Sequence, residues 1–150
     1  MKISTLSGAM LALVLGAGTM VLPSVQVAFA AADAPALLSP GLLVPKMDAA
    51  LGRKLFATTG CAVCHSVNGI GGEDAPPLDA EYMDTPMNPF DFAARMWRGA
   101  EAMQAMQRSE LGGIIDLSGE ELAAITAFIH DAEEQAKYSE SDWSKSVADS

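Results

Sequence analysis

The sequence has few residues of the kinds that bind metal ions or nucleic acids. Its 150 residues include two cysteines and two histidines, so the paired Cys and His spacings of structural zinc sites are missing. Nine Lys and Arg stand against nineteen Asp and Glu, which gives a formal net charge of −10. This balance argues against nucleic acids and anionic lipids as partners, because both attract basic surfaces. No Ser/His/Asp set or carboxylate pair indicates a hydrolytic mechanism.

Strand patterns and repeats are missing from the sequence as well. No segment alternates convincingly between apolar and polar residues, and no internal repeat is visible. Apolar residues instead recur every three or four positions in several segments, which is typical of helices that bury one face. The sequence therefore predicts an all-α fold.

A long apolar run stands at the start of the chain. Lys2 is followed by a nearly uncharged stretch from Ile3 to Leu22 and then by Ala28-Phe29-Ala30. This order is typical of an export signal, residues 1–30, and predicts a periplasmic protein. If it is not cleaved, the run is long enough to serve as an N-terminal membrane anchor. We expect cleavage, and no stable membrane insertion afterwards, because Ser, Thr and Gly dilute the run.

The remainder of the chain suffices for one modest core. About 120 residues remain after cleavage, with a formal net charge of −11 because Lys2 is the one charged residue removed. Residues 31–46 contain three prolines and are expected to form an extended leader. We assign residues 47–134 to a single folded domain and residues 135–150 to a polar, flexible C-terminal tail.

Four helical segments are expected in this part of the chain. The first spans 47–59, where apolar residues recur every four positions before Gly60. The second begins at Asn88-Pro89, the third spans 101–111, and the fourth spans 118–137 with a capping box at its start. Residues 68–89 are rich in Gly, Pro, Asp and Asn, and so long a loop in a small domain indicates that it wraps a ligand.

The pentapeptide "CAVCH", residues 61–65, carries the chemistry. A thioredoxin-like dithiol needs a βαβ framework that a helical chain lacks, and a zinc site fails on ligand number. A structural disulfide explains both thiols but leaves the adjacent imidazole without a role. A covalent haem explains all three residues, because two thioether bonds tether the macrocycle and the following residue supplies an iron ligand. We therefore expect one haem c, bound through Cys61, Cys64 and His65.

Residues 47–131 resemble the class I c-type cytochromes. The resemblance rests on "GRKLFATTGCAVCHSVNGIGGEDAPPL", on the Met-bearing segment after it, and on "LSGEELAAITAFIHD" as a closing helix. It implies three to five helices wrapped around one covalently attached haem. It also implies that the first and last helices cross closely at Gly52 and Phe128. A backbone carbonyl at Pro76 or Pro77 would then accept a hydrogen bond from His65 and fix its ring.

A methionine thioether is expected as the second axial ligand of the iron. His130, the only other histidine, is interpreted as a helix-end residue away from that face of the haem. The segment "MWRGAEAMQAM" resembles a pattern of small exported cytochromes in which the ligand follows the Trp by six residues. This indicates Met103 as the ligand, with Met106 as the alternative. Arg95 and Arg98 either hold a haem propionate or are solvated.

The function implied by the resemblance is that of a periplasmic one-electron carrier and not of an enzyme. With His65 and Met103 filling both axial positions, small molecules are excluded from the iron. The expected partners are redox proteins with a basic docking surface. Two alternatives stay open: a cytochrome subunit of a dehydrogenase complex, and a haem enzyme or gas-binding protein with a displaceable distal ligand.

Overall fold

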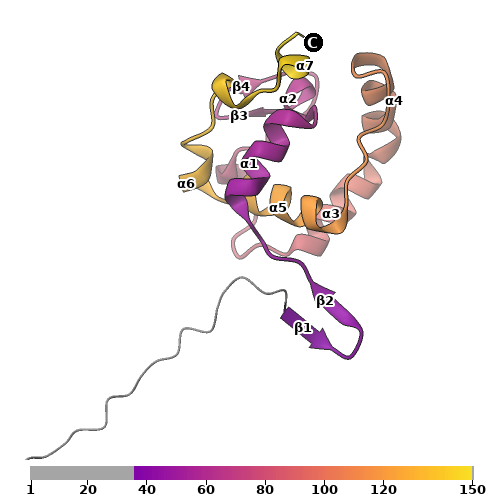
Figure 1. The fold of residues 1–150 in the computed structure, drawn as a ribbon, viewed down its shortest axis with the longest axis vertical. Helices are drawn as coiled ribbons and strands as arrows, with labels where there is room; N and C mark the ends of the chain where they lie inside the picture. Colours follow the sequence, from indigo (N-terminus) through magenta and orange to yellow (C-terminus); the bar gives the residue numbers. More distant parts are fainter. Residues whose placement is uncertain (1–35, 150) are drawn as a thin grey trace, which may run out of the picture. The chain divides into compact units, whose positions relative to one another are not determined.

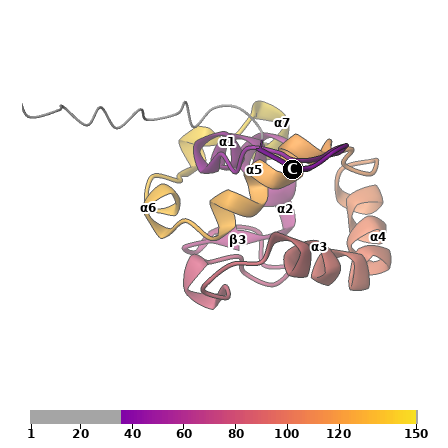
Figure 2. The ribbon, with the colours of Figure 1, turned by 90° about the horizontal axis from the view of Figure 1, so that it is seen from below.

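Two helices that are distant in the sequence form the centre of the fold. The computed structural model describes residues 36–149, and the expected signal sequence, residues 1–30, lies outside the described residues. Helix α1 (Ala49–Thr58) and helix α5 (Gly119–Ile129) pack side by side (Figures 1 and 2). They match the first and last helices expected from the periodicity, so the all-α class is confirmed.

Both central helices begin with a side-chain cap: α1 starts two residues later than the expected position 47, and α5 starts where the sequence predicts. The Asp48 carboxylate accepts a hydrogen bond from the Leu51 backbone N–H at 3.0 Å, at the start of α1. At the start of α5, the Ser118 hydroxyl accepts a bond from the Glu121 N–H at 3.2 Å, and the Glu121 carboxylate accepts one from the Ser118 N–H at 2.9 Å. The second arrangement is the expected capping box. Each cap contributes about 1 kcal/mol to helix stability.

Gly52 determines how closely α1 and α5 approach each other. A Cβ atom at this position would lie 1.9 Å from the Ala124 carbonyl oxygen and 2.8 Å from the Phe128 Cβ atom. Both distances are shorter than non-bonded contacts allow, so the crossing requires a residue without a side chain. The close crossing expected at Gly52 and Phe128 is confirmed.

Aromatic side chains fill the core around this crossing. The Phe56 and Phe128 ring centroids lie 5.6 Å apart, and the Tyr138 ring stands edge-on to Phe56 at 5.5 Å. Such pairs contribute about 0.5–1.5 kcal/mol beyond the burial of their area. Val67, which follows the pentapeptide closely, and Ile129 are fully buried in the same cluster. The core therefore joins α1, the chain after the pentapeptide, α5 and the C-terminal segment.

The second and third helices expected from the sequence are both present and are separated by the single residue Gly99. These are α3 (Pro89–Arg98) and α4 (Ala100–Glu110), which lie on the side of the fold away from α6 (Ala132–Gln135) (Figure 1). The Asn88 side chain accepts a hydrogen bond from the Phe90 N–H at 3.0 Å, so α3 starts with the predicted N-cap. Among the residues that the structure describes, no helix has both the length and the apolar character to cross a bilayer.

Short strands occur where the sequence shows no alternation. Strands β1 (Ala36–Ser39) and β2 (Leu42–Val44) form an antiparallel hairpin within the leader. Strands β3 (Ser66–Val67) and β4 (Ile70–Gly71) form a second hairpin directly after the pentapeptide, with a left-handed residue, Asn68, in its turn. Strands of two to four residues are too short for a period of two to be recognised.

The fourth helical segment is shorter than expected. It ends at Ile129, and the Asp131 carboxylate caps the separate one-turn helix α6 by accepting a hydrogen bond from the Glu134 N–H at 2.9 Å. A 3₁₀ turn (Glu140–Asp142) and helix α7 (Lys145–Ala148) follow. Asp at an N-cap competes with continuation of a helix, because its side chain binds the backbone N–H groups of the next turn.

The residues after α6 pack on the core, whereas their composition led us to expect a flexible tail. The Trp143 indole Nε1–H donates a hydrogen bond to the Tyr138 hydroxyl at 2.7 Å. Tyr138 and Val147 are both buried. Burial also raises the pKa of Tyr138 to about 12, so the phenol stays neutral. The few apolar side chains of this polar stretch are the ones that make the contacts.

An ion-pair cluster holds the C-terminal segment to α1. Arg53 Nε donates to Glu134 Oε1 at 2.9 Å, and Arg53 Nη1 pairs with Asp142. Lys137 pairs with the second oxygen of Glu134 at 2.6 Å. The Arg53, Glu134 and Asp142 side chains are 10–18% exposed, so these charges are largely shielded from water. Removal of Glu134 would break the pairs with both Arg53 and Lys137, because it is the partner that they share.

We predict that Gly52→Ala lowers the free energy of unfolding by about 3 kcal/mol or more, because the added methyl group forces α1 and α5 apart. Denaturant titration of the holoprotein measures this change. Gly119→Ala is the matched control: a Cβ atom there meets nothing within 4 Å, so its effect should stay within about 0.5 kcal/mol. Equal losses in the two variants would contradict a tight crossing at Gly52.

A second prediction concerns acid stability. Lys137 and Arg53 hold the pKa of Glu134 below its ordinary value of 4.5. A lowered pKa stabilises the fold above the ordinary value, and this contribution is lost as the pH falls through the lower, folded-state value. The unfolding free energy of Glu134→Gln should therefore fall less steeply below pH 4.5 than that of the parent protein. Glu133→Gln, on an exposed neighbour, should retain the parent slope; identical slopes in all three proteins would refute the prediction.

Candidate functional site

The pentapeptide occupies a sharp turn at the end of α1. Gly60 ends the helix with a left-handed backbone (φ 104°), and residues 61–64 then form the one-turn helix α2 (Cys61–Cys64). A Cβ atom at Gly60 would also lie 2.8 Å from Leu111 Cδ1, so the Leu111 side chain already occupies the space that a side chain at Gly60 would need. A left-handed residue without a side chain satisfies both conditions. The turn thus brings both cysteines and the following histidine into one short stretch.

Cys61 and Cys64 are free thiols in the structure. Burial raises the pKa of both thiols, and the nearby carboxylates of Asp74 and Glu110 raise that of Cys64 further. The two thiols are not joined in a disulfide, so both sulfur atoms are available for covalent attachment.

His65 is oriented by a backbone carbonyl group. Its Nδ1 atom lies 2.7 Å from the Pro76 carbonyl oxygen. A carbonyl oxygen only accepts hydrogen bonds, so Nδ1 carries a proton, and in the neutral imidazole the lone pair is then on Nε2. Of the two prolines that the sequence left open, the structure selects Pro76. The imidazole is thus fixed in the tautomer that binds a metal through Nε2.

The loop after the pentapeptide closes directly onto it. Gly72 N–H donates to the Ala62 carbonyl at 2.9 Å, Ala75 N–H to the Cys64 carbonyl at 3.0 Å, and Leu78 N–H to the Ser66 carbonyl at 2.8 Å. These bonds place the loop backbone against the pentapeptide. The loop also supplies the carbonyl that orients the histidine, and its expected role in wrapping a ligand stays a prediction.

Met103 lies in a separate part of the structure, on α4. It contributes to a cavity of about 210 Å³ between α3, α4 and α5. The lining is almost entirely apolar and comes from Ala93, Met96, Trp97, Ala100, Met103 and Leu122. Met106, one turn further along α4, is not among these residues. The structure thus places the sulfur of Met103 in apolar surroundings.

A second cavity adjoins the pentapeptide. It measures about 350 Å³ and is formed by the end of α1, the end of α4, the chain after α4 and helix α7. Its lining residues are Thr58, Thr59, Gly60, Glu110, Leu111, Gly113, Ile114, Ile115, Ser146 and Val147. The contribution of α7 to this cavity was not predicted from the sequence. The isolated apolar residue Val147 in a polar stretch was the one available signal.

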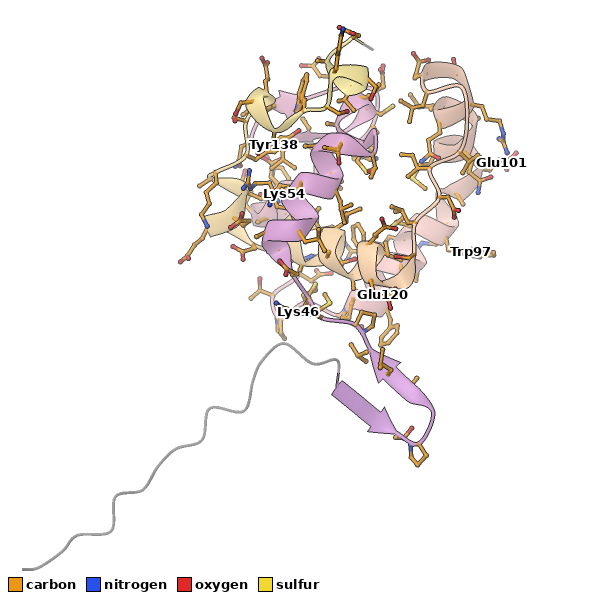
Figure 3. All side chains as sticks on the ribbon, in the orientation of Figure 1. Lys46, Lys54, Trp97, Glu101, Glu120 and Tyr138 are labelled. Carbon is orange, nitrogen blue, oxygen red and sulfur yellow. The ribbon has the colours of Figure 1, made fainter. Side chains whose placement is uncertain are left out.

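His130 and Arg95 lie outside these cavities and have partners, whereas Trp97 lines the cavity at Met103. His130 is the C-cap of α5, with Nδ1 2.7 Å from the Thr126 carbonyl oxygen, which agrees with a helix-end role. Arg95 forms an ion pair with Asp84. Trp97 is 83% exposed, and Figure 3 shows it with Glu101 on the α3–α4 side, apart from Tyr138. Within residues 36–149 no cluster of three or more His, Cys, Asp and Glu could hold a metal ion.

The side chains at this site fit a covalently attached haem. The two free thiols can form thioether bonds, and the Nε2 lone pair of His65 can bind iron. The apolar cavity at Met103 offers a thioether sulfur and little competing polar surface. No other described residues combine two free thiols with an oriented imidazole.

Comparison with protein-family models matches residues 49–133 to the family described as Cytochrome c. Comparisons with curated protein sequences and with solved structures gave no match. The matched residues run from α1 to the start of α6 and include the pentapeptide, the loop that covers it and α4.

Proposed function

Because the chain belongs to the cytochrome c family, whose members transfer electrons through a covalently attached haem c, we propose that it is a periplasmic one-electron carrier with His65 and Met103 as axial iron ligands. The observation that carries the proposal is the 2.7 Å contact between His65 Nδ1 and the Pro76 carbonyl, directly after two free thiols. It leaves Nε2 of the imidazole free to bind the iron. Export to the periplasm is supported by the apolar N-terminal run and its small-residue exit.

The roles of the residues follow from their chemistry. When bound, haem c supplies an iron that alternates between the ferric and ferrous states by taking up and releasing one electron. Cys61 and Cys64 hold the group through their sulfur atoms, and His65 is kept in a fixed orientation by Pro76. A hydrogen bond to a carbonyl group raises the basicity of the ligating imidazole.

Met103 is favoured over Met106 by its surroundings. Met103 lines the apolar cavity with Met96 and Leu122, and Met106 does not. A thioether is a soft ligand that stabilises ferrous iron, and apart from Met96 the apolar lining of the cavity offers no other side-chain ligand to compete with it. Filling of both axial positions would exclude small molecules, which favours a carrier over an enzyme that acts on peroxide or gases.

The charge of the chain suits transient docking to basic redox proteins. Residues 31–150 have a formal net charge of −11. Asp74 and Glu110 lie close enough to Cys64 to raise its pKa, so negative charge is present next to one attachment point. Long-range attraction between opposite charges increases association rates and weakens with salt.

Substitution of the methionine that binds the iron should abolish the sulfur–iron bond. We predict that Met103→Ala removes the far-red sulfur-to-iron charge-transfer band of the oxidised protein and raises its reactivity toward small ligands, because one axial position is left open. Absorption spectra of both oxidation states measure this. Met106→Ala, one turn away on the same helix, is the matched control and should retain the band.

The opposite result would identify a different ligand. Loss of the band in Met106→Ala alone would transfer the ligand role to that residue. A parent protein without colour, or one whose pigment is extracted by acidified acetone, would overturn covalent haem attachment altogether.

Electrostatic docking leads to a further prediction. Oxidation of the reduced protein by tris(phenanthroline)cobalt(III), a cation, should slow as ionic strength rises, whereas oxidation by the hexacyanoferrate(III) anion should accelerate. The double variant Asp74→Asn/Glu110→Gln should slow the reaction with the cation about threefold at low salt, because the charges next to Cys64 are lost. Glu133→Gln on α6 serves as the control. Stopped-flow rates with the same salt trend for both oxidants would contradict a docking surface of negative charge.

A further inference from the structure

Gln135 is a buried polar side chain with every amide atom engaged. It lies in α6 and is 2% exposed. Its Nε2 donates a hydrogen bond to the Leu78 carbonyl oxygen at 2.9 Å, and its Oε1 accepts one from the Ala80 backbone N–H at 2.8 Å. A side chain that bonds to both a carbonyl and an N–H of one segment, here the residues that lead into the 3₁₀ turn Ala80–Tyr82, fixes that segment in position and in direction.

The segment that Gln135 holds is the one that orients His65. Leu78 is two residues after Pro76, whose carbonyl oxygen lies 2.7 Å from His65 Nδ1. On its other side the segment is attached to the chain after the pentapeptide. Leu78 N–H donates to the Ser66 carbonyl at 2.8 Å, and the Asp79 carboxylate accepts a bond from Asn68 N–H at 2.8 Å.

Asn68 connects the turn between β3 and β4 to both the segment of residues 76–80 and α6. Its side-chain Nδ2 donates a hydrogen bond to the backbone carbonyl oxygen of Gln135 at 3.2 Å. The turn between β3 and β4, the segment of residues 76–80 and α6 therefore form one hydrogen-bonded unit. Within this unit, Gln135 is the member that brings the C-terminal part of the chain to the loop, and nothing in the composition of residues 132–137 indicates such a role.

We propose that Gln135 is a positioning residue for the iron ligand: by fixing Leu78 and Ala80, it holds the Pro76 carbonyl at hydrogen-bond distance from His65. The inference rests on the proposed ligation of iron by His65. Leu78 is joined to Pro76 through a single residue, Pro77, whose ring restricts the backbone, so a displacement at Leu78 is transmitted to the Pro76 carbonyl. A weaker bond to Nδ1 lowers the basicity of the imidazole and makes the ferric state less favourable.

The test compares the reduction potential of the holoprotein with that of Gln135→Met and Gln135→Asn. Methionine keeps the length of the side chain and removes both hydrogen bonds, whereas asparagine keeps the amide but is too short to reach both partners. We expect the equilibrium to shift toward the ferrous state about threefold to tenfold in Gln135→Met, a rise of about 30–60 mV for one electron. Gln135→Asn should shift it in the same direction by less.

Amide hydrogen exchange in the reduced protein provides a second readout. The Leu78 amide, which donates to Ser66 and not to Gln135, should lose protection in both variants if the segment moves. The control is Thr126→Val, which removes a buried hydroxyl that bonds to the Leu122 carbonyl within α5 and makes no hydrogen bond to residues 76–80. It should lower stability without changing the potential or the exchange of Leu78.

Failure of this inference can be told apart from failure of the proposed function. If the variants retain the sulfur band and the parent potential, the positioning role of Gln135 is refuted while His65 and Met103 stay as ligands. A shift of equal size in Thr126→Val would also refute it, because general loosening would then explain the change. If the parent protein binds no haem, the proposed function itself fails.

Discussion

The contact between Gly52 on α1 and the Ala124 carbonyl on α5 is the constraint on which the rest of the structure depends. It brings two helices from opposite ends of the domain to backbone contact, and this contact gathers Phe56, Phe128 and Tyr138 into one core. The end of α1 is thereby fixed relative to α5, and the pentapeptide follows at that end. A site built on a rigid helix terminus keeps its geometry better than one on a free loop.

Backbone hydrogen bonds, and not side-chain packing alone, complete the site. The loop of residues 71–78 donates three N–H groups to the pentapeptide and its extension and returns one carbonyl, that of Pro76, to His65. Such a loop has too few apolar residues to hold itself by burial. Its position depends on polar partners, among which Gln135 is the most buried. The C-terminal segment is thus part of the structure around the site.

Charge has two different functions in the chain. Near the core, Arg53, Glu134 and Asp142 are shielded from water, and their mutual pairing attaches the C-terminal segment to α1. On the surface, the excess of carboxylates is solvated and acts at long range. The first set influences stability and responds to acid, whereas the second influences association and responds to salt.

Local signals in the sequence were sufficient to predict the central helices and the caps at Ser118 and Asn88, and they indicate the attachment residues. Ser118 and Asn88 cap helices because the hydrogen bonds involved span two or three residues, and Cys61, Cys64 and His65 form one unit because they are neighbours in the chain. The class of fold and the nature of the cofactor could therefore be predicted. Met103 was reached through a resemblance, and its role as ligand stays a prediction.

Contacts between distant residues were decided by the tertiary structure. The hydrogen bonds from the Gln135 side chain to Leu78 and Ala80 join segments that lie far apart in the chain, as does the packing of Tyr138 and Val147 on the core around Phe56. The choice of Pro76 over Pro77 likewise depends on how the loop folds back onto His65. The polar composition of residues 135–150 predicts a loose tail because composition reports average burial and not specific partners. A single buried amide that finds its partners across the fold outweighs that average, and only the folded arrangement brings the partners within reach.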